Sequence, residues 1–196
     1  MFLIFDCETT GKANFRLPAT HPSQPRIVQL AAVLLDDDLS ERAAFSFIIK
    51  PYGWTIPDEA AAIHGITTQI AMRVGIEIST ALSQLCWFSM KARTRIAHNI
   101  DFDDLMIAVE FAHAGDEWAV DDMSSFCTMH AMTPICRLPS VSPYARPGEF
   151  KWPKLTEAYK HCFGREMEGA HDALADVRGC ADVYRWLKQH EQKQAV

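Results

Sequence analysis

The stretch Phe2-Leu3-Ile4-Phe5-Asp6-Cys7-Glu8-Thr9-Thr10-Gly11 joins a short apolar strand to two carboxylates. Side chains alternate between the two faces of a strand, so Asp6 and Glu8 point one way and Cys7 points the other, where we expect it to pack. Two acids on one side of a buried strand's end repel each other and are hard to desolvate. A divalent cation relieves both penalties, because it binds carboxylate oxygens. This pattern indicates a metal-dependent enzyme whose substrate carries phosphates.

Length and composition set the outer limits. The 196 residues, 48% of them hydrophobic, predict one domain, 1–196, with a core of its own. The formal net charge of −6 lacks the basic signature of proteins that bind nucleic acid passively. An enzyme that meets phosphates through metal ions does not need that signature.

The cysteines and the apolar runs indicate where in the cell the protein is expected. Six cysteines, at positions 7, 86, 127, 136, 162 and 180, form no Cys-x-x-Cys pair, so we expect reduced thiols and no zinc or redox motif. The apolar run Phe2–Phe5 ends at once in Asp6, which excludes a signal peptide. No run approaches the roughly 18 apolar residues that span a bilayer. We expect a cytoplasmic protein without membrane contact.

The order of apolar runs and turn residues predicts an α/β layered domain. Strands are expected over 2–6, 27–35 and 43–49, as an antiparallel meander, and over 94–97. Helices are expected over 57–64, 80–91, 155–163 and 173–187, and from an Asn99 or Asp101 cap to Gly115. Residues 133–153, with five prolines, predict a long loop.

Three acid-bearing segments lie at the predicted ends of elements. They are Asp6-x-Glu8, His98-Asn99-Ile100-Asp101-Phe102-Asp103-Asp104 and Gly169-Ala170-His171-Asp172-Ala173-Leu174-Ala175-Asp176. Acids at helix starts usually cap the helix or complement its dipole, and this explanation is favoured for Asp101, Asp104 and Asp172. The joint occurrence of the three segments favours convergence on one cleft.

Together, the segments resemble the DEDDh (DnaQ-like) family of 3′–5′ exonucleases, whose members include the proofreading subunit of bacterial DNA polymerase III. The matching pieces are Phe5-Asp6-x-Glu8-Thr9-Thr10-Gly11, His98-Asn99-x-x-Phe102-Asp103 and His171-x-x-x-x-Asp176. A weaker match is Glu59-x-x-x-x-His64-Gly65-Ile66. The resemblance covers nearly the whole chain. It implies a ribonuclease H-like fold, in which parallel strands extend the antiparallel meander into a mixed sheet flanked by helices.

The resemblance also implies a role for each matching residue. Two divalent cations, Mg²⁺ or Mn²⁺, would be held by Asp6, Glu8, Asp103 and Asp176, and His171 would be the general base. Asp103 is chosen over Asp101 because it directly follows Phe102, as in the motif. The residues that would approach the terminal nucleotide are Thr9, Thr10, Glu59 and His64.

This residue set suits phosphodiester hydrolysis. Two divalent ions about 3.5–4 Å apart can supply the attacking hydroxide, in-line geometry and charge relief on the leaving oxygen. An imidazole can accept a proton near neutral pH. His171 and Asp176 lie five residues apart, roughly 140° around an ideal helix, so we expect His171 just before the first turn.

Other residues are candidates for contact with nucleic acid. Backbone contacts could come from Lys91, Arg93, Arg95, Arg146, Lys151 and Lys154, although each is more simply explained as solvated surface. Trp152 and Phe15 can stack on bases, but packing in the fold is the favoured explanation for both.

The leading hypothesis is a 3′–5′ exonuclease that acts on single-stranded DNA with a free 3′ end and releases nucleoside monophosphates. Proofreading or repair, with a DNA polymerase as partner, would be its setting, and the oligomeric state is left open. One alternative is an exoribonuclease of the same fold that trims RNA 3′ ends, because the motifs do not read the 2′-OH. Another is an inactive nuclease-like nucleic-acid-binding module, against which the complete set of acids argues. An acidic structural protein would leave the coincidence of the three motifs unexplained.

Overall fold

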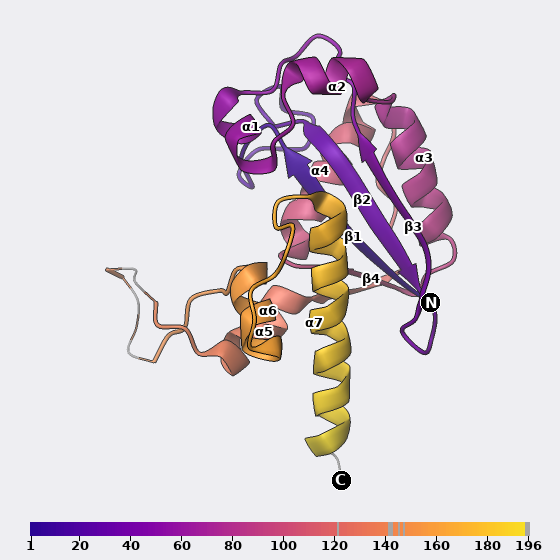
Figure 1. The fold of residues 1–196 in the computed structure, drawn as a ribbon. Helices are drawn as coiled ribbons and strands as arrows, with labels where there is room; N and C mark the ends of the chain where they lie inside the picture. The colour runs from indigo at the N-terminus through magenta and orange to yellow at the C-terminus, as the bar shows by residue number, and fades with distance from the viewer. Residues whose placement is uncertain (121, 141–142, 145, 147, 195–196) are drawn as a thin grey trace.

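The computed structural model describes residues 1–120, 122–140, 143–144, 146 and 148–194, with side chains in the last helix described as far as Glu191. The described strands form one sheet in the order β3-β2-β1-β4-β5 (Figure 1). They are β1 (Phe2–Thr9), β2 (Ile27–Leu35), β3 (Glu41–Ile48), β4 (Thr94–Ala97) and β5 (Ser124–Cys127).

Strand direction divides the sheet into two parts. β2 pairs antiparallel with β1 and β3, whereas β4 pairs parallel with β1 and β5. A tight turn at Asp36–Ser40 closes the β2–β3 hairpin, with Asp36 N–H bonded to the Ser40 carbonyl at 2.9 Å. Parallel strands need longer crossovers, and here helices lie between β3, β4 and β5 in the chain. The predicted mixed sheet with an antiparallel meander is confirmed.

Helices cover both faces of the sheet, which is why all nine residues of β2 are buried. Leu3, Phe5 and Cys7 of β1 pack in one cluster with α3 (Ile78–Ser89) and α4 (Ile100–His113). Ile4 packs on the opposite face with the long helix α7 (Ala173–Gln194), which crosses the sheet in Figure 1. The even-numbered positions of β1 therefore face α7.

The shorter helices lie at two places around the sheet. α1 (Asp58–His64) and α2 (Thr68–Val74) lie at the end where β1 terminates (Figure 1). α1 ends as predicted at Gly65, whose φ of 76° suits glycine. α5 (Thr128–Cys136) and α6 (Leu155–Phe163) pack beside α7 in a cluster that includes Met132, Tyr159 and Leu187.

Three elements were not predicted, for different reasons. α2 is only seven residues long, and β5 exposes its first two residues and lacks an apolar alternation. α5 contains Pro134, so its last residues, 133–136, were wrongly placed in the predicted loop 133–153. Burial of Met132 beneath the neighbouring helices stabilises α5 despite the proline. Within the rest of that loop, Pro139 and Phe150 form a β-bridge, and residues 141, 142, 145 and 147 lie outside the described residues.

The start of α4 also differs from the prediction. Asn99 precedes the helix in a left-handed conformation, with φ of 80°, and its side chain makes no capping hydrogen bond. Asp101 lies within the first turn, so neither residue is the expected side-chain cap. Asn tolerates this conformation better than most residues do. The turn lets α4 begin directly after β4, which places Asp103 one turn from the end of the sheet.

Two simpler expectations can be compared with the structure. All six cysteines are free, as predicted. Among the described residues, no helix has both the length and the apolar character that crossing a membrane requires.

A buried ion pair fastens the loop before β2 to α4. The Glu110 carboxylate, almost fully buried, accepts hydrogen bonds from Arg26 Nε at 2.9 Å, Arg26 Nη2 at 2.7 Å and Ile27 N–H at 2.9 Å. Thr10 is bonded to Arg26 in turn: the Thr10 N–H donates to the Arg26 carbonyl, and the Arg26 N–H donates to Thr10 Oγ1, both at 2.9 Å. This chain of contacts holds the turn that follows β1.

We expect Glu110→Ala to lower the free energy of unfolding by about 3–5 kcal/mol, because it leaves the Arg26 guanidinium without its buried partner. Urea unfolding followed by circular dichroism measures the change. Glu166→Ala is the matched control, since Glu166 pairs with Lys160 on the exposed surface and should change stability very little. Equal effects of the two substitutions would contradict the structural role of Glu110.

Candidate active site

The first segment of the site is the carboxyl end of β1. Asp6 and Glu8 lie on the α7 side of this strand, and Cys7 is buried on the opposite side, as predicted. β4 accompanies β1 only as far as the Ile4–Ile96 pair. The edge of β1 beyond Ile4 is therefore open to a side chain from another element.

Asp103 of α4 occupies that edge. The Cys7 N–H donates to Asp103 Oδ1 at 3.0 Å, and the Asp103 side chain is 2% exposed. Asp101 is exposed, and Asp104 pairs with Arg95 Nη2 at 3.0 Å. Of the acids in this segment, the structure brings Asp103 to the end of β1, where its charge acts on Asp6.

The third segment forms a tight turn ahead of α7. His171 has a φ of 71°, and Asp172 Oδ1 accepts the Ala175 N–H at 3.0 Å as a helix cap. Because α7 begins at Ala173, His171 lies before the helix, as expected, and Asp176 lies in its first turn. The His171 N–H donates to Asp176 Oδ2 at 3.2 Å, which fixes the two residues relative to each other.

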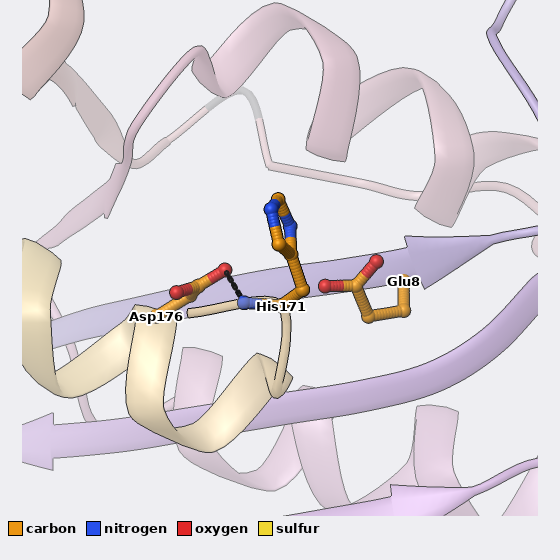
Figure 2. A group of neighbouring side chains, drawn as sticks. All are labelled: Glu8, His171 and Asp176. Carbon is orange, nitrogen blue, oxygen red and sulfur yellow. Dashed lines mark hydrogen bonds between the residues drawn. The ribbon is translucent and has the colours of Figure 1, made fainter. Parts of the chain in front are cut away.

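The first and third segments meet in front of the sheet. Figure 2 shows the Glu8 carboxylate directed toward the turn that carries His171, with Asp176 on the other side of that turn. Glu8, His171 and Asp176 each offer one potential ligand atom, and these atoms all lie within 4.8 Å of one another. Such spacing is suited to a metal ion.

Burial and mutual repulsion disfavour the charged forms of these acids. Burial raises the pKa of Asp6, and the charges of Asp103, Asp176 and Glu8 raise it further. Burial followed by the charges of Asp176 and Asp172 raises the pKa of Glu8 to about 7. The pKa of Asp176 rises to about 6, chiefly through burial. Burial also raises the pKa of Asp103, although the Cys7 N–H opposes this.

The donor atoms fit a hard divalent cation. Asp176 Oδ1 is buried and has no hydrogen-bond partner among the described residues. An unpaired buried oxygen is costly, and so is a group of carboxylates with no cation among them. Carboxylate oxygens are the ligands that Mg²⁺ prefers. The cluster therefore has the composition and the unmet electrostatic demand of a metal site.

A cavity of about 540 Å³ opens beside Glu8, between the end of β1 and α1. This volume falls in the range of small-molecule sites. Its lining includes the predicted substrate-contacting residues Thr9, Thr10, Glu59 and His64. The other lining residues are Cys7, Glu8, Gly11, Lys12, Pro57, Ala60, Ile63 and Phe102.

Thr9, Thr10 and His64 differ in whether their polar side-chain atoms already have hydrogen-bond partners. Thr9 Oγ1 donates to the Gly11 carbonyl at 2.7 Å, and Thr10 Oγ1 accepts the Arg26 N–H at 2.9 Å, so both hydroxyls shape the turn. His64 Nδ1 accepts the Ile66 N–H at 3.1 Å, while Nε2 is buried without a hydrogen-bond partner among the described residues. Burial lowers the pKa of His64, and the charge of His171 adds to this, while the Thr9 backbone opposes both.

Some predicted nucleic-acid contacts have other partners, and two aromatic side chains are exposed. Arg93 pairs with Asp37, and Lys151 Nζ lies 2.6 Å from Glu157 Oε1. Trp152 is 63% exposed and Phe15 is 60% exposed, so the expectation that both pack in the fold was wrong.

Two polar residues support the site, although the sequence analysis gave a role to neither. His98 is bonded through Nδ1 to Thr128 Oγ1 and through Nε2 to the Pro153 carbonyl, both at 2.9 Å, so it ties two distant segments to the end of β4. Gln29 of β2 contacts the start of α7. The sequence did offer one signal for Gln29, because it is the single polar residue in the apolar run Ile27–Leu35.

Comparisons with known proteins identify related exonucleases. A family model described as exonuclease (RNase_T) matches residues 3–184. An uncharacterized exonuclease, CP81, of Escherichia phage 186 is 30% identical over 183 residues, which cover 90% of this chain and 82% of the phage protein.

Solved structures of E. coli exonuclease I are also similar. The zinc-bound form in complex with single-stranded DNA has a TM-score of 0.75 and 25% identity, covering 97% of this chain and 41% of that one. A complex with a dA16 oligonucleotide shares the fold, with a TM-score of 0.76 and 24% identity, covering 98% of this chain and 41% of that one. The chain thus spans about two fifths of the exonuclease I length. The predicted ribonuclease H-like fold is confirmed.

The raised carboxylate pKa values predict how stability depends on pH in EDTA. The folded protein binds protons at Glu8 and Asp176 more tightly than the unfolded chain does, with pKa values of about 7 and about 6 in place of 4.5 and 3.8. Its Tm should therefore fall as the pH rises from about 4 to about 7 and then level off. Differential scanning calorimetry in EDTA measures this dependence.

Mn²⁺ should raise the Tm more at pH 8 than at pH 5, because only the ionised carboxylates bind it well. Glu8→Gln is the control variant, and its Tm in EDTA should depend less on pH. A Tm in EDTA that stays constant between pH 4 and pH 7 would contradict the electrostatic account.

Proposed function

The chain belongs to the DEDDh family of 3′–5′ exonucleases, and from this premise we propose that it removes nucleotides one at a time from the 3′ end of single-stranded DNA. The reaction is hydrolysis: a water oxygen bonds to phosphorus as the bond to the 3′ oxygen of the preceding nucleotide breaks. A nucleoside 5′-monophosphate leaves, and the shortened strand keeps a 3′ hydroxyl.

One observation carries the proposal. Carboxylates from three distant segments meet at the end of β1, beside His171 and at the mouth of a cavity large enough for a small ligand. A fold alone does not define a function, because the same fold supports many activities. Here the residues of the family motifs and the cavity occur together in space.

We assign Asp6, Glu8, Asp103 and Asp176 as the ligands of two divalent cations, with Mg²⁺ and Mn²⁺ as the ions that suit an oxygen-rich site. Asp6 is buried, and the charges of the other three acids all act on it. In this chemistry the bound cations neutralise charge on the phosphate and lower the pKa of a water. The protein contributes by holding the four carboxylates together.

His171 is assigned as the general base. Its backbone is fixed by the bond to Asp176, and its imidazole rises from the turn between the Asp176 and Glu8 carboxylates in the view of Figure 2. A ring nitrogen of His171 would accept a proton from the attacking water as the new bond to phosphorus forms. Because His171 lies ahead of α7 and Asp176 lies in its first turn, their side chains leave the chain at different points, and the imidazole would be free to face the phosphate.

The cavity between β1 and α1 would receive the terminal nucleotide. Residues of α1 form one wall and the Thr9–Lys12 turn forms another, which favours an end of a strand over an internal segment. The unpartnered Nε2 of His64 and the Glu59 carboxylate are the polar groups of α1 at this wall. DNA is proposed as the substrate because exonuclease I structures that resemble this chain hold DNA oligonucleotides.

The direct test is a time course on 5′-labelled single-stranded DNA and RNA of the same sequence with Mg²⁺. We expect a ladder that shortens from the 3′ end, faster on DNA, and complete arrest by EDTA. Faster degradation of RNA would assign the exoribonuclease function instead. Cleavage that persists in EDTA would rule out the metal-dependent scheme.

Two neighbouring acids on α4 provide a matched pair of variants for that assay. Asp103→Asn should lower the rate by more than about 100-fold, because even outer-shell changes at metal sites cost 10–100-fold. Asp101→Asn makes the same chemical change at an exposed position and should leave the rate unaltered. A fully active Asp103→Asn enzyme would remove this residue from the site.

His171→Ala should lower kcat by about 10²–10⁴-fold, the usual contribution of a general base. Binding of single-stranded DNA in Ca²⁺, measured by fluorescence anisotropy, should change little, because the metal ligands remain. An unchanged kcat at neutral pH would show that another group accepts the proton.

A further inference from the structure

Gln29 is a buried polar residue in an otherwise apolar strand. It is the third residue of β2, the second strand of the sheet, is 5% exposed, and stands directly opposite Glu8 in the β1–β2 register. An amide in such a place needs hydrogen-bond partners, because burial without them is costly. Its partners come from two different elements.

The Gln29 amide forms two hydrogen bonds with residues at the start of α7. Its Oε1 accepts the Ala173 N–H at 3.2 Å, and its Nε2 donates to Asp172 Oδ2 at 3.1 Å and to Ser46 Oγ of β3 at 3.0 Å. The chemistry fixes this orientation of the amide, since a backbone N–H can only donate and a carboxylate can only accept. No other uncharged side chain of this length supplies both functions at once.

The segment that Gln29 contacts carries both members of the cluster that come from this part of the chain: His171 just before α7, and Asp176 in its first turn. Asp172 directly follows His171, and Ala173 is the first residue of α7. His171 is held at a φ of 71°, a conformation that non-glycine residues keep only when the surroundings enforce it. The contacts of Gln29 thus connect β2, beside Glu8, to the segment that carries His171 and Asp176.

We propose that Gln29 is a positioning residue that sets the placement of His171 and Asp176 relative to Glu8. The inference rests on the proposed function for its catalytic consequence, but the placement itself concerns the protein alone. Gln29 acts through Asp172 and Ala173 and does not contact the substrate. A merely structural role would affect stability and leave the turnover rate of the folded enzyme unchanged.

Exchanging donor and acceptor across this contact provides the test. In Gln29→Glu, the new carboxylate faces the Asp172 carboxylate and the two repel each other. In Asp172→Asn, the single amide oxygen cannot accept hydrogen bonds from both the Ala175 N–H and Gln29 Nε2 at their present positions. In the double variant Gln29→Glu/Asp172→Asn, the amide introduced at position 172 can donate to the carboxylate introduced at position 29, while the amide oxygen still accepts the Ala175 N–H. The double variant also keeps the net charge of the wild type.

Each single variant should lower kcat by about 10–100-fold with KM within about twofold of wild type, as for other supports of metal ligands. The double variant should recover most of that loss. Mn²⁺ affinity without substrate, measured by electron paramagnetic resonance, should weaken and recover in the same order. Hydrogen exchange at the Ala173 amide should do likewise, because this first N–H of α7 has no partner within the helix and its protection reports the Gln29 contact.

Leu85→Ala is the control for stability, because Leu85 packs on the opposite face of the sheet and should leave kcat, Mn²⁺ affinity and Ala173 exchange unchanged. The proposal would be overturned if hydrogen exchange at the Ala173 amide were unaltered in Gln29→Glu. It would also be overturned if kcat of the double variant were no higher than that of the slower single variant. A wild-type protein that does not degrade nucleic acid would instead refute the proposed function, and exchange and Mn²⁺ binding would still decide the role of Gln29.

Discussion

Mutual repulsion among buried carboxylates is the constraint on which the site depends. Four acids meet at one end of the sheet, and burial first, then the charges of neighbouring carboxylates, raises the pKa values of Asp6, Glu8, Asp103 and Asp176. In a protein without a cation this arrangement opposes folding near neutral pH. The rest of the fold holds the acids in place, and a cation bound among them would relieve both their burial and their repulsion.

Backbone groups supply much of the restraint. β1 extends beyond its last pair with β4, so the Cys7 N–H is available to donate to Asp103. The His171 N–H donates to Asp176 in a similar way. The buried pair of Glu110 and Arg26 secures the turn after β1 in the same manner. The position of the acid cluster therefore follows from where strands and helices end. Substitutions at these supporting positions are expected to alter the site without touching its ligands.

The fold was largely readable from the sequence where apolar runs were long or sharply bounded. Residues 27–35 and 94–97 form strands with the predicted bounds, and residues 155–163 form the predicted helix. The prediction failed where tertiary contacts outweigh local preference, as at α5, which remains helical through Pro134 because Met132 is buried below it. The long helix α7 continues past its predicted end at Leu187, since no glycine or proline stops it.

By itself, the sequence determined the family, because the motifs that contain Asp6, Glu8, Asp103, His171 and Asp176 resemble that family in kind and order, regardless of how the chain folds between them. Only the tertiary structure decided which groups hold these residues in register. Hydrogen bonds such as that from Gln29 to the start of α7 join positions far apart in the chain, and their pairing leaves no periodic signal. The cavity beside Glu8 is likewise a product of packing, because β1 and α1 form its walls only once the sheet has placed them together.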